Sequence, residues 1–318
     1  MLKQKARARS AKIDQIAIWA SSGFVILIRP FLWATSWVLI KIGLDDLDLE
    51  PVAFAGLRYA VGAAVLLPFG FRAIRRARHS RGPIDRSLLV RVLLLGLVLY
   101  SAAQGFQFAA LALLPAAAVG MILATIPLWV GLVAWRRGEE AGSGWQAAGI
   151  AVVVAGAALY FGAIDLGAAG PIGLALAAGC ALASTTGQHL ARDLNRDAHD
   201  RLGGAVGLTT LSMTAGSIVL LIAGVLLEGW PELDLRGWLI VAWLAVVNTA
   251  FAFTLYNHAL RSVTAVESSV IVNLLLVMVA GLAWAFLGEG LDARQIAGLA
   301  LVTGGTIAVQ LAPRLRRG

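Results

Sequence analysis

The chain has 318 residues, of which 59% are hydrophobic and 14% are charged, and its formal net charge is +8. Soluble domains carry roughly 25% charged residues. A chain this poor in charge cannot cover its apolar surface with polar side chains, so we expect lipid to be its solvent. The single cysteine, Cys180, excludes a disulfide framework and gives no metal-site spacing. We expect neither a metal nor another cofactor.

Apolar segments long enough to cross a bilayer recur along the whole chain. A spanning helix needs roughly 20 mostly apolar residues, and the first segment continues too far to be the apolar core of a signal peptide. The sequence therefore predicts an all-α membrane protein with ten transmembrane helices, at residues 16–43, 51–70, 88–111, 116–135, 145–163, 171–190, 203–227, 236–259, 264–287 and 293–311.

The basic residues are divided unevenly between the two sides that these helices define. If the N-terminus is cytoplasmic, 20 Lys and Arg residues fall on the cytoplasmic side and only two, Arg236 and Arg294, fall on the other. The positive-inside rule therefore predicts that both termini are cytoplasmic. The basic segments would face the anionic inner leaflet, so nucleic acid is not needed to explain the positive charge. The bias toward Ala, Gly, Leu and Arg suggests a bacterial source, and hence the inner (plasma) membrane.

The chain contains an internal repeat. Residues 110–156 match residues 259–305 without a gap, at an offset of 149 positions. The matches include residue types that carry more weight than a shared Ala or Leu: Trp135 with Trp284, Glu140 with Glu289, and Gln146 with Gln295. Glycines in the last helix of each copy suit close helix packing: Gly149, Gly156, Gly298, Gly304 and Gly305.

This repeat defines the predicted domain organisation. We expect a basic cytoplasmic N-terminus over residues 1–15, a first repeat of five helices over 16–163, a second over 171–311 and a basic cytoplasmic tail over 312–318. Because five is odd, the second copy would insert upside down relative to the first. Inverted repeats of this kind are typical of secondary transporters, which hold substrate near the midplane and alternate access by rocking one half against the other.

Several short motifs occur in order along both copies. They are Trp33-Ala-Thr-Ser-Trp37 with Lys41, Phe54 to Pro68 with Arg58, Phe108-Ala-Ala-Leu111 followed by Ala116, Pro127 and Glu139-Glu140, and then Tyr256-Asn-His-Ala-Leu260, Ala265 and Leu287-Gly-Glu289. From about residue 15 onward, the chain resembles the drug/metabolite transporter superfamily, specifically ten-helix exporters with two EamA-type repeats. It departs from that pattern at Leu276, which stands where the first copy has Pro127.

The resemblance implies export of small organic metabolites or drugs through a central cavity, and within the superfamily the chain looks most like YddG-type aromatic amino-acid exporters. Cationic-drug pumps normally need a carboxylate inside the membrane that exchanges a proton for the cation. Here all 18 acidic residues lie in loops or near helix ends. The deepest, Glu267, is interpreted as part of a capping box that starts with Thr264. We therefore expect facilitative export of amino acids, with a proton-coupled multidrug or other metabolite exporter as the alternative.

Arg58 and the polar and aromatic residues within the predicted spans are the candidate substrate-binding residues. Arg58 either holds a substrate carboxylate, or it extends outward or pairs with Asp45, Asp46, Asp48 or Glu50 in the adjoining loop. Deep Asn and Gln residues either join helices or line a wet cavity, and aromatic walls suit amphipathic substrates. The predicted set is Trp33, Trp37, Arg58, Tyr59, Tyr100, Gln104, Trp129, Ser184, Gln188, Asn248, Tyr256 and Asn273.

Two other classes of membrane protein fit the sequence less well. A cation pore would be expected to show rings of acidic residues or an exposed carbonyl filter. An intramembrane enzyme would need a nucleophile with a base, or metal ligands, within the spans, and His189 lies nine positions from Cys180, so a helix would leave the two well apart. The expected partners are a small-molecule substrate and the lipid bilayer, and two inverted halves in one chain are consistent with a functional monomer.

Overall fold

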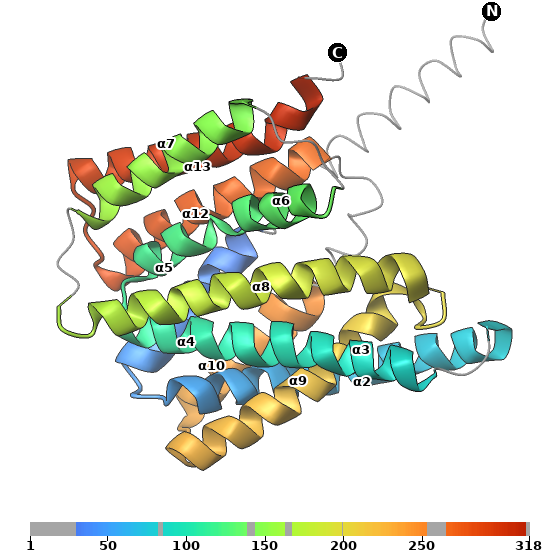
Figure 1. Cartoon of the computed structure of the whole chain (residues 1–318). Coiled ribbons are helices and arrows are strands. Elements are labelled where there is room, and N and C mark those ends of the chain that lie inside the picture. The colour runs from blue at the N-terminus through green and yellow to red at the C-terminus, as the bar shows by residue number, and fades with distance from the viewer. Residues whose placement is uncertain are drawn as a thin grey trace, which may run out of the picture.

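The structure is a computed structural model that describes residues 30–81, 85–138, 144–162, 167–198, 200–252 and 265–315, and these residues form helices without any strand. Figure 1 shows the helices stacked in layers, with their axes running in broadly similar directions. In chain order they are a helix over residues 30–45, α2 (Pro51–Arg81), α3 (Arg86–Gly96), the π-helical segment η1 (Leu97–Ala102), α4 (Ala103–Leu113), α5 (Ala116–Leu123), α6 (Ile126–Arg136), α7 (Gly144–Phe161), α8 (Gly170–Ala198), α9 (Gly204–Glu228), α10 (Leu235–Ala245), the π-helical segment η2 (Val246–Phe251), α12 (Ala265–Leu287) and α13 (Ala293–Leu315).

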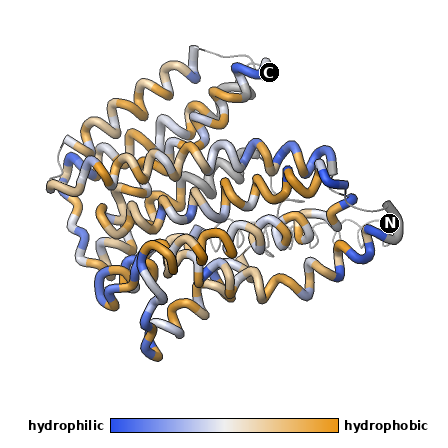
Figure 2. Tube along the Cα trace, turned by 60° about the horizontal axis from the view of Figure 1, so that its bottom comes forward, coloured by the Kyte–Doolittle hydropathy of each residue, from blue (hydrophilic) through white to orange (hydrophobic). Residues whose placement is uncertain are grey.

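Hydrophobic residues occupy the middle of most helices, and hydrophilic residues gather at helix ends (Figure 2). Six helices of the described part are long and apolar enough to cross a membrane: Pro51–Arg78, Arg86–Leu113, Ala116–Val133, Gly144–Phe161, Gly170–Asp197 and Gly204–Glu228. Three shorter apolar helices, Leu235–Phe251, Leu274–Leu287 and Ala293–Val309, follow in the second half. Six of the ten predicted spans are therefore clear in the described residues, and shorter apolar helices lie where three further spans were predicted.

Two pairs of long helices pack with almost no space between their backbones. At the α2–α9 contact, a Cβ added to Gly56 would lie 2.5 Å from the Leu221 Cα, and one added to Gly224 would lie 2.5 Å from the Ala53 Cα. Since the residue number rises along α2 as it falls along α9, the two helices run antiparallel. Figure 1 shows α2 and α9 at one side of the stack and the second pair, α7 and α13, at the other.

The α7–α13 contact is a seam of four glycines. A Cβ on Gly149 would lie 3.0 Å from the carbonyl oxygen of Gly305, and one on Gly156 would lie 2.9 Å from that of Gly298. A Cβ on Gly298 would lie 2.7 Å from the carbonyl oxygen of Gly156, and one on Gly305 would lie 2.8 Å from that of Gly149. Adding 149 to the α7 glycines gives the α13 glycines, so the seam maps onto itself when the two repeats are exchanged. Gly304 is a correction to the predicted packing glycines, because nothing lies within 4 Å of a Cβ placed there.

The repeat extends further back than the sequence comparison reached. Asp85 is the N-cap of α3 and accepts a hydrogen bond of 2.7 Å from the Leu88 N–H, while Asp234 is the N-cap of α10 and accepts one of 2.7 Å from the Gly237 N–H. Both caps and both donors are separated by the offset of 149. The same offset relates η1 to η2 residue for residue. A π-helical turn is rare and is often found at functional sites.

The two copies differ where the first has a proline. The predicted helix over 116–135 is divided into α5 and α6, with Ala124 and Thr125 in a turn and Pro127 in the first turn of α6. Proline lacks an N–H and its ring clashes with the preceding turn, which explains the division. At the equivalent position Leu276 lies inside α12, which continues unbroken to Leu287.

Candidate functional site

A buried polar group lies where α2 faces η1 and α4. The Tyr59 hydroxyl donates a hydrogen bond of 2.5 Å to the Gln104 Oε1, and the Gln104 Nε2 donates one of 3.4 Å to the Leu99 carbonyl oxygen within the π-helical segment. The rings of Tyr59 and Tyr100 meet edge to face with centroids 6.1 Å apart. Three of the predicted binding residues, Tyr59, Tyr100 and Gln104, are therefore brought together.

Arg58 adds a positive charge to this group. Its side chain is 5% exposed, and its Cζ lies 5.0 Å from the centre of the Tyr59 ring and 5.8 Å from that of Phe108. The Phe108 ring in turn meets Phe54 at a centroid distance of 5.3 Å. Arg58 lies seven residues into α2, which at a rise of 1.5 Å per residue places it roughly 10 Å from the start of the helix.

Arg58 has no carboxylate partner within the described part of the chain, and its Nε has no hydrogen-bond acceptor there. The nearby acidic residues are engaged elsewhere or are exposed: Asp45 pairs with Lys41 at 3.1 Å, and Asp46 pairs with Arg236 at 3.1 Å. Asp48 and Glu50 are exposed. The structure therefore does not contain the predicted alternative in which Arg58 pairs with this loop. An ion buried without its counter-ion is disfavoured by several kcal/mol, which two aromatic faces at about 0.5–2 kcal/mol each offset in part.

The predicted residues of α8 lie at different depths. Cys180 is buried, and its Sγ lies 3.9 Å from the Oγ of Ser184, which is partly buried. Gln188 is exposed. Gly179 packs on the Phe106 ring and Gly187 on Leu99, so α8 lies directly against α4 and η1.

Asn248 occupies a second polar group, in η2. Its Nδ2 donates a hydrogen bond to the Leu32 carbonyl oxygen and lies 3.3 Å from the Thr35 Oγ1, so it joins η2 to the helix over residues 30–45. Its Oδ1 is buried without a donor in the described residues. This arrangement matches the helix-joining role that was one of the two predicted for deep Asn and Gln residues.

The remaining predicted residues do not join either group among the described contacts. Trp37 is buried and lies near Gly120 on α5, and Trp33 is partly buried. Trp129 is 44% exposed and donates a hydrogen bond of 3.2 Å to the Thr125 Oγ1 at the break between α5 and α6. Tyr256 and the side chain of Asn273 lie outside the described residues, as does the side chain of Glu267.

Charged residues from distant segments cap the helices that carry the site. Glu228, the last residue of α9, accepts hydrogen bonds of 2.9 and 2.8 Å from the N–H groups of Val52 and Ala53 at the start of α2. Glu289 accepts one of 2.8 Å from the Ala116 N–H at the start of α5. Lys41, which the sequence places at the outer end of the first helix, donates one of 2.9 Å to the Leu111 carbonyl oxygen in α4.

Sequence reasoning missed these contacts and also the two phenylalanines beside Arg58. A signal for the Glu289 cap was present, because α5 begins after Pro115 without a Ser, Thr, Asp or Asn to satisfy its free N–H groups. The recurrence of Glu at positions 140 and 289 was used to find the repeat, but its capping role was not inferred. Phe54 and Phe108 were read only as motif residues.

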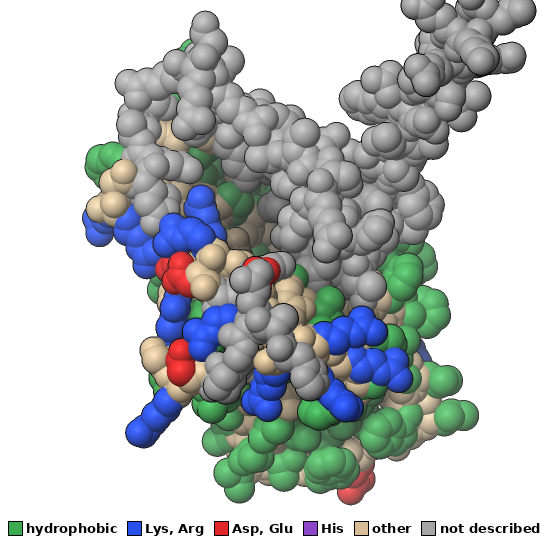
Figure 3. Space-filling model, turned by 90° about the vertical axis from the view of Figure 1, so that its right-hand side faces the viewer, with side chains coloured by type: hydrophobic (Ala, Val, Ile, Leu, Met, Phe, Trp, Pro, Cys, Tyr) green, Lys and Arg blue, Asp and Glu red, His purple; other side chains and the backbone are tan. Residues whose placement is uncertain are grey.

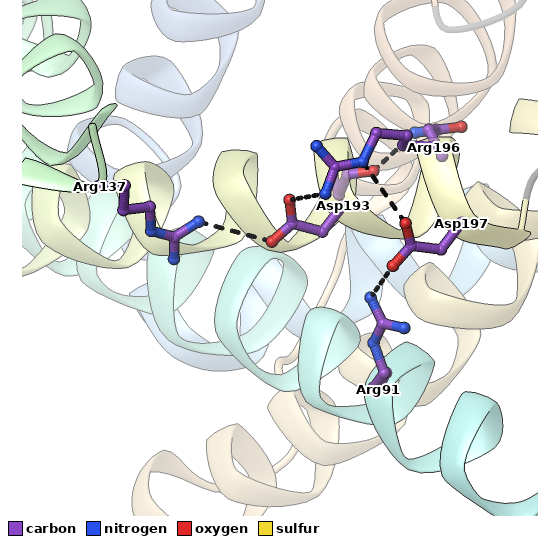
Figure 4. Close-up of polar contacts among 7 residues, drawn as sticks. Arg91, Arg137, Asp193, Arg196 and Asp197 are labelled. Carbon is purple, nitrogen blue, oxygen red and sulfur yellow. Dashed lines mark hydrogen bonds and ion pairs between the residues drawn. The ribbon is translucent and has the colours of Figure 1, made fainter. Parts of the chain in front are cut away.

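Ion pairs connect three helices at the end of the molecule where α2 and α8 finish and α3 begins (Figure 4). Arg91 of α3 pairs with Asp197 of α8 at 3.1 Å, Arg196 lies 3.5 Å from Asp197 and 3.8 Å from Asp193, and Asp193 lies 3.6 Å from Arg137 after α6. Nearby, Arg201 pairs with Asp85 at 2.8 Å. The Leu88 N–H, together with Arg201, lowers the pKa of the exposed Asp85 carboxyl.

Long apolar helices in a repeated arrangement, with polar groups buried between them, indicate a multi-pass membrane protein. The sequence pattern of the EamA-like transporter family matches the chain twice, over residues 21–162 and 172–311. The chain therefore belongs to the EamA-like transporter family, within the drug/metabolite transporter superfamily, and this membership points to a transporter and away from an enzyme.

The structural comparison agrees with this fold. Fifteen solved chains match, and one of them, described as "Crystal structure of protein", has a TM-score of 0.62 and 19% sequence identity. The match covers 94% of this chain and 99% of the solved one. At this identity the likeness concerns the fold alone. No curated protein matches the chain.

Proposed function

We propose that this transporter exports amino acids, with aromatic or other apolar side chains preferred, by facilitated alternating access through a central cavity. Arg58 carries the proposal. A guanidinium buried between aromatic rings, without a carboxylate partner in the described residues, provides the counter-charge for a substrate carboxylate and can bind it through two parallel hydrogen bonds.

The surroundings of Arg58 support a substrate that is partly apolar. Phe54, Phe108, Tyr59 and Tyr100 supply aromatic surface, and the Tyr59–Gln104 hydrogen bond supplies polar atoms beside it. An amino acid with an apolar side chain combines a carboxylate with a surface of this kind. The proposed binding set also keeps the other predicted residues, including Tyr256 and Asn273.

The proposed topology has ten spans in two inverted repeats, with both termini on the cytoplasmic side of a bacterial inner membrane. The antiparallel α7–α13 seam supports the inversion: α7 closes the first matched repeat and α13 the second, and two equivalent helices that run antiparallel require oppositely oriented halves. The excess of basic residues on one predicted side supports the orientation.

A proton-coupled exporter of cationic drugs is the runner-up. It would need a carboxylate exposed to the cavity. Among the described side chains of the helices, carboxylates lie in the last two turns, as with Asp193, Asp197 and Glu228. Glu267 would then be the exchanging group, and the Arg58 site would have no role in the transport of a cation.

Paired flux measurements in proteoliposomes test the proposal. Wild-type protein should release labelled tryptophan at a rate that an imposed pH gradient does not change, and it should not transport tryptamine, which lacks the carboxylate. Arg58→Gln should strongly lower tryptophan efflux, whereas Arg196→Gln, which removes an exposed arginine from the ion pairs of α8, should leave it unchanged. Movement of cationic dyes driven by the pH gradient, with no amino-acid flux, would contradict both the substrate class and the mechanism.

A further inference from the structure

The outward face of the last turns of α2 is basic, and most of that charge has no ion-pair partner among the residues that the structure describes. Four exposed arginines lie in those turns: Arg72, Arg75, Arg76 and Arg78. We call these four residues the α2 arginine patch. Figure 3 shows Lys and Arg gathered on the end of the molecule to which these turns belong. Within the part of the chain that the structure describes, Arg72, Arg75 and Arg78 have no carboxylate partner.

The patch contrasts with the arginines of α3, of α8 and of the turn after α8 at the same end. Arg91, Arg196 and Arg201 each pair with an aspartate at 2.8–3.8 Å. Their charge is compensated by these aspartates, so they attract an external anion only weakly. Within the described residues, Arg72, Arg75 and Arg78 of the patch therefore carry positive charge that no carboxylate compensates.

The helix geometry places the patch away from the protein core. At 100° per residue, the four arginines cover roughly 160° of the α2 circumference. Gly70, Ile74 and Ala77 are buried on the opposite side, where Gly203 and Gly207 of the α9 segment pack against Ala73 and Ile74. The patch thus faces the surroundings of the protein.

The residues just before the patch indicate what surrounds it. Phe69 is 58% exposed and Phe71 is 68% exposed, so large apolar rings point outward in the residues directly before Arg72. α2 has 31 residues, which at a rise of about 1.5 Å give a length of about 46 Å, whereas the hydrocarbon core of a bilayer is about 30 Å thick. α2 is therefore longer than the hydrocarbon core requires, and its basic final turns would reach the lipid headgroups with the phenylalanines at the edge of the acyl region.

We propose that the α2 arginine patch binds the phosphate group of anionic phospholipids. Each unpaired guanidinium offers a planar set of N–H donors that matches phosphate oxygens, and Phe69 and Phe71 contact the acyl chains of the same lipid. The site depends on α2 alone and not on the transported substrate.

Lipid retention measured by native mass spectrometry tests this site on the full chain. Protein in nanodiscs of mixed phosphatidylcholine and phosphatidylglycerol should retain phosphatidylglycerol preferentially. The triple variant Arg72→Gln, Arg75→Gln, Arg78→Gln should lose that preference by about fivefold for each arginine that contacts the lipid, since each basic residue near a membrane surface contributes about 1 kcal/mol. The charge-preserving lysine triple should keep most of it.

A matched control separates the site from net charge. The triple variant Arg91→Gln, Arg196→Gln, Arg201→Gln removes the same charge from the same end but takes it from paired arginines, and it should keep the preference. An equal loss in both glutamine triples would overturn the proposal in favour of a general charge effect. Displacement of the bound lipid by millimolar inorganic phosphate would also overturn it, because the acyl chains would then contribute nothing.

Discussion

The two repeats share a scaffold but differ in the side chains that it carries. Asp85 and Asp234 cap equivalent helices, η1 and η2 interrupt them at equivalent positions, and the α7–α13 seam is the same from either side. The first repeat, in contrast, has Arg58 buried in α2, whereas α9 contains no basic residue. Symmetry has been kept in the helix caps, the π-helical segments and the seam through which the two repeats pack. It has been lost where an asymmetric small molecule would bind.

The polar groups of the two π-helical segments also differ. In η1 the side chain of Tyr100 lies beside Tyr59 and near Gln104, next to the buried cation. In η2 the residue equivalent to Leu99 is Asn248, which joins η2 to the helix over residues 30–45. One segment therefore contributes to a candidate binding site, while the other fastens neighbouring helices.

The largest expected effect comes from removing the charge that distinguishes the first repeat. Arg58→Gln should lower the efflux of an apolar amino acid roughly 10- to 100-fold, because a charge-assisted hydrogen bond contributes about 1.5–3 kcal/mol. Arg58→Lys should recover part of the rate, since it keeps the charge but not the planar pair of donors. Proteoliposome efflux measures both, and unchanged efflux in Arg58→Gln would show that the asymmetry has no part in binding.

The glycine seam between α7 and α13 tests the scaffold that the two repeats share, and the neighbouring Gly304 provides a control. Gly305→Ala should lower the free energy of unfolding by about 1–3 kcal/mol, because its Cβ would approach the backbone of α7 and force the helices apart. Gly304→Ala should not destabilise the protein, because its Cβ would meet nothing within 4 Å. Thermal unfolding in detergent compares the two, and equal effects would mean that the close approach is not what the glycines provide.

The break between α5 and α6 can be tested by giving the first repeat the residue that the unbroken α12 has at the equivalent position. Pro127→Leu gives the first repeat the residue that stands at position 276 in the second. The restored N–H can bond the carbonyl of residue 123, so we expect α5 and α6 to join and the stability to rise by about 1 kcal/mol. Pro68→Leu, within the continuous α2, is the control for loss of a proline. If efflux stays at the wild-type rate in the stabilised variant, the break is not a moving part of the transporter.

The smallest effect is expected at the repeated caps. Because the Leu88 N–H and Arg201 lower the pKa of Asp85, its ionised carboxylate stabilises the folded state above the carboxyl pKa of the unfolded chain, and this contribution is lost as the pH falls through the lowered value. Asp85→Asn keeps a capping oxygen but loses the ion pair with Arg201. We therefore expect a slightly lower melting temperature than wild type at neutral pH, with the difference vanishing under strongly acidic conditions. A difference in melting temperature that persisted under strongly acidic conditions would show that the effect does not come from the Asp85 carboxylate.

The repeat could be predicted because matching residues recur in the sequence at one constant offset. Trp, Glu and Gln at a constant spacing of 149 revealed it, and Asp85 with Asp234 would have extended it had the caps been compared. The family also followed from the order of short motifs. The repeat and the family motifs depend only on the types and spacing of residues along the chain, which can be read directly from the sequence.

The surroundings of Arg58 and the π-helical segments could not be predicted in the same way. Helices in a bilayer are apolar around much of their circumference, so hydrophobic periodicity does not reveal which face turns inward. The rotation of α2 depends on its packing against neighbouring helices, including the close approach to α9 at Gly56 and Gly224, and in this packing Arg58 lies beside Phe108. The same limit explains why Trp129, which was predicted among the substrate-binding residues, lies 44% exposed.

The self-matching seam also bears on the origin of the chain. A surface that contacts its own repeat-equivalent needs no specialised partner, because two separate copies of a single half would meet through it equally well. The contact can therefore be older than the fusion of the halves. Once both halves were in one chain, the seam kept them together, and a change such as Arg58 could arise in one half without being imposed on the other.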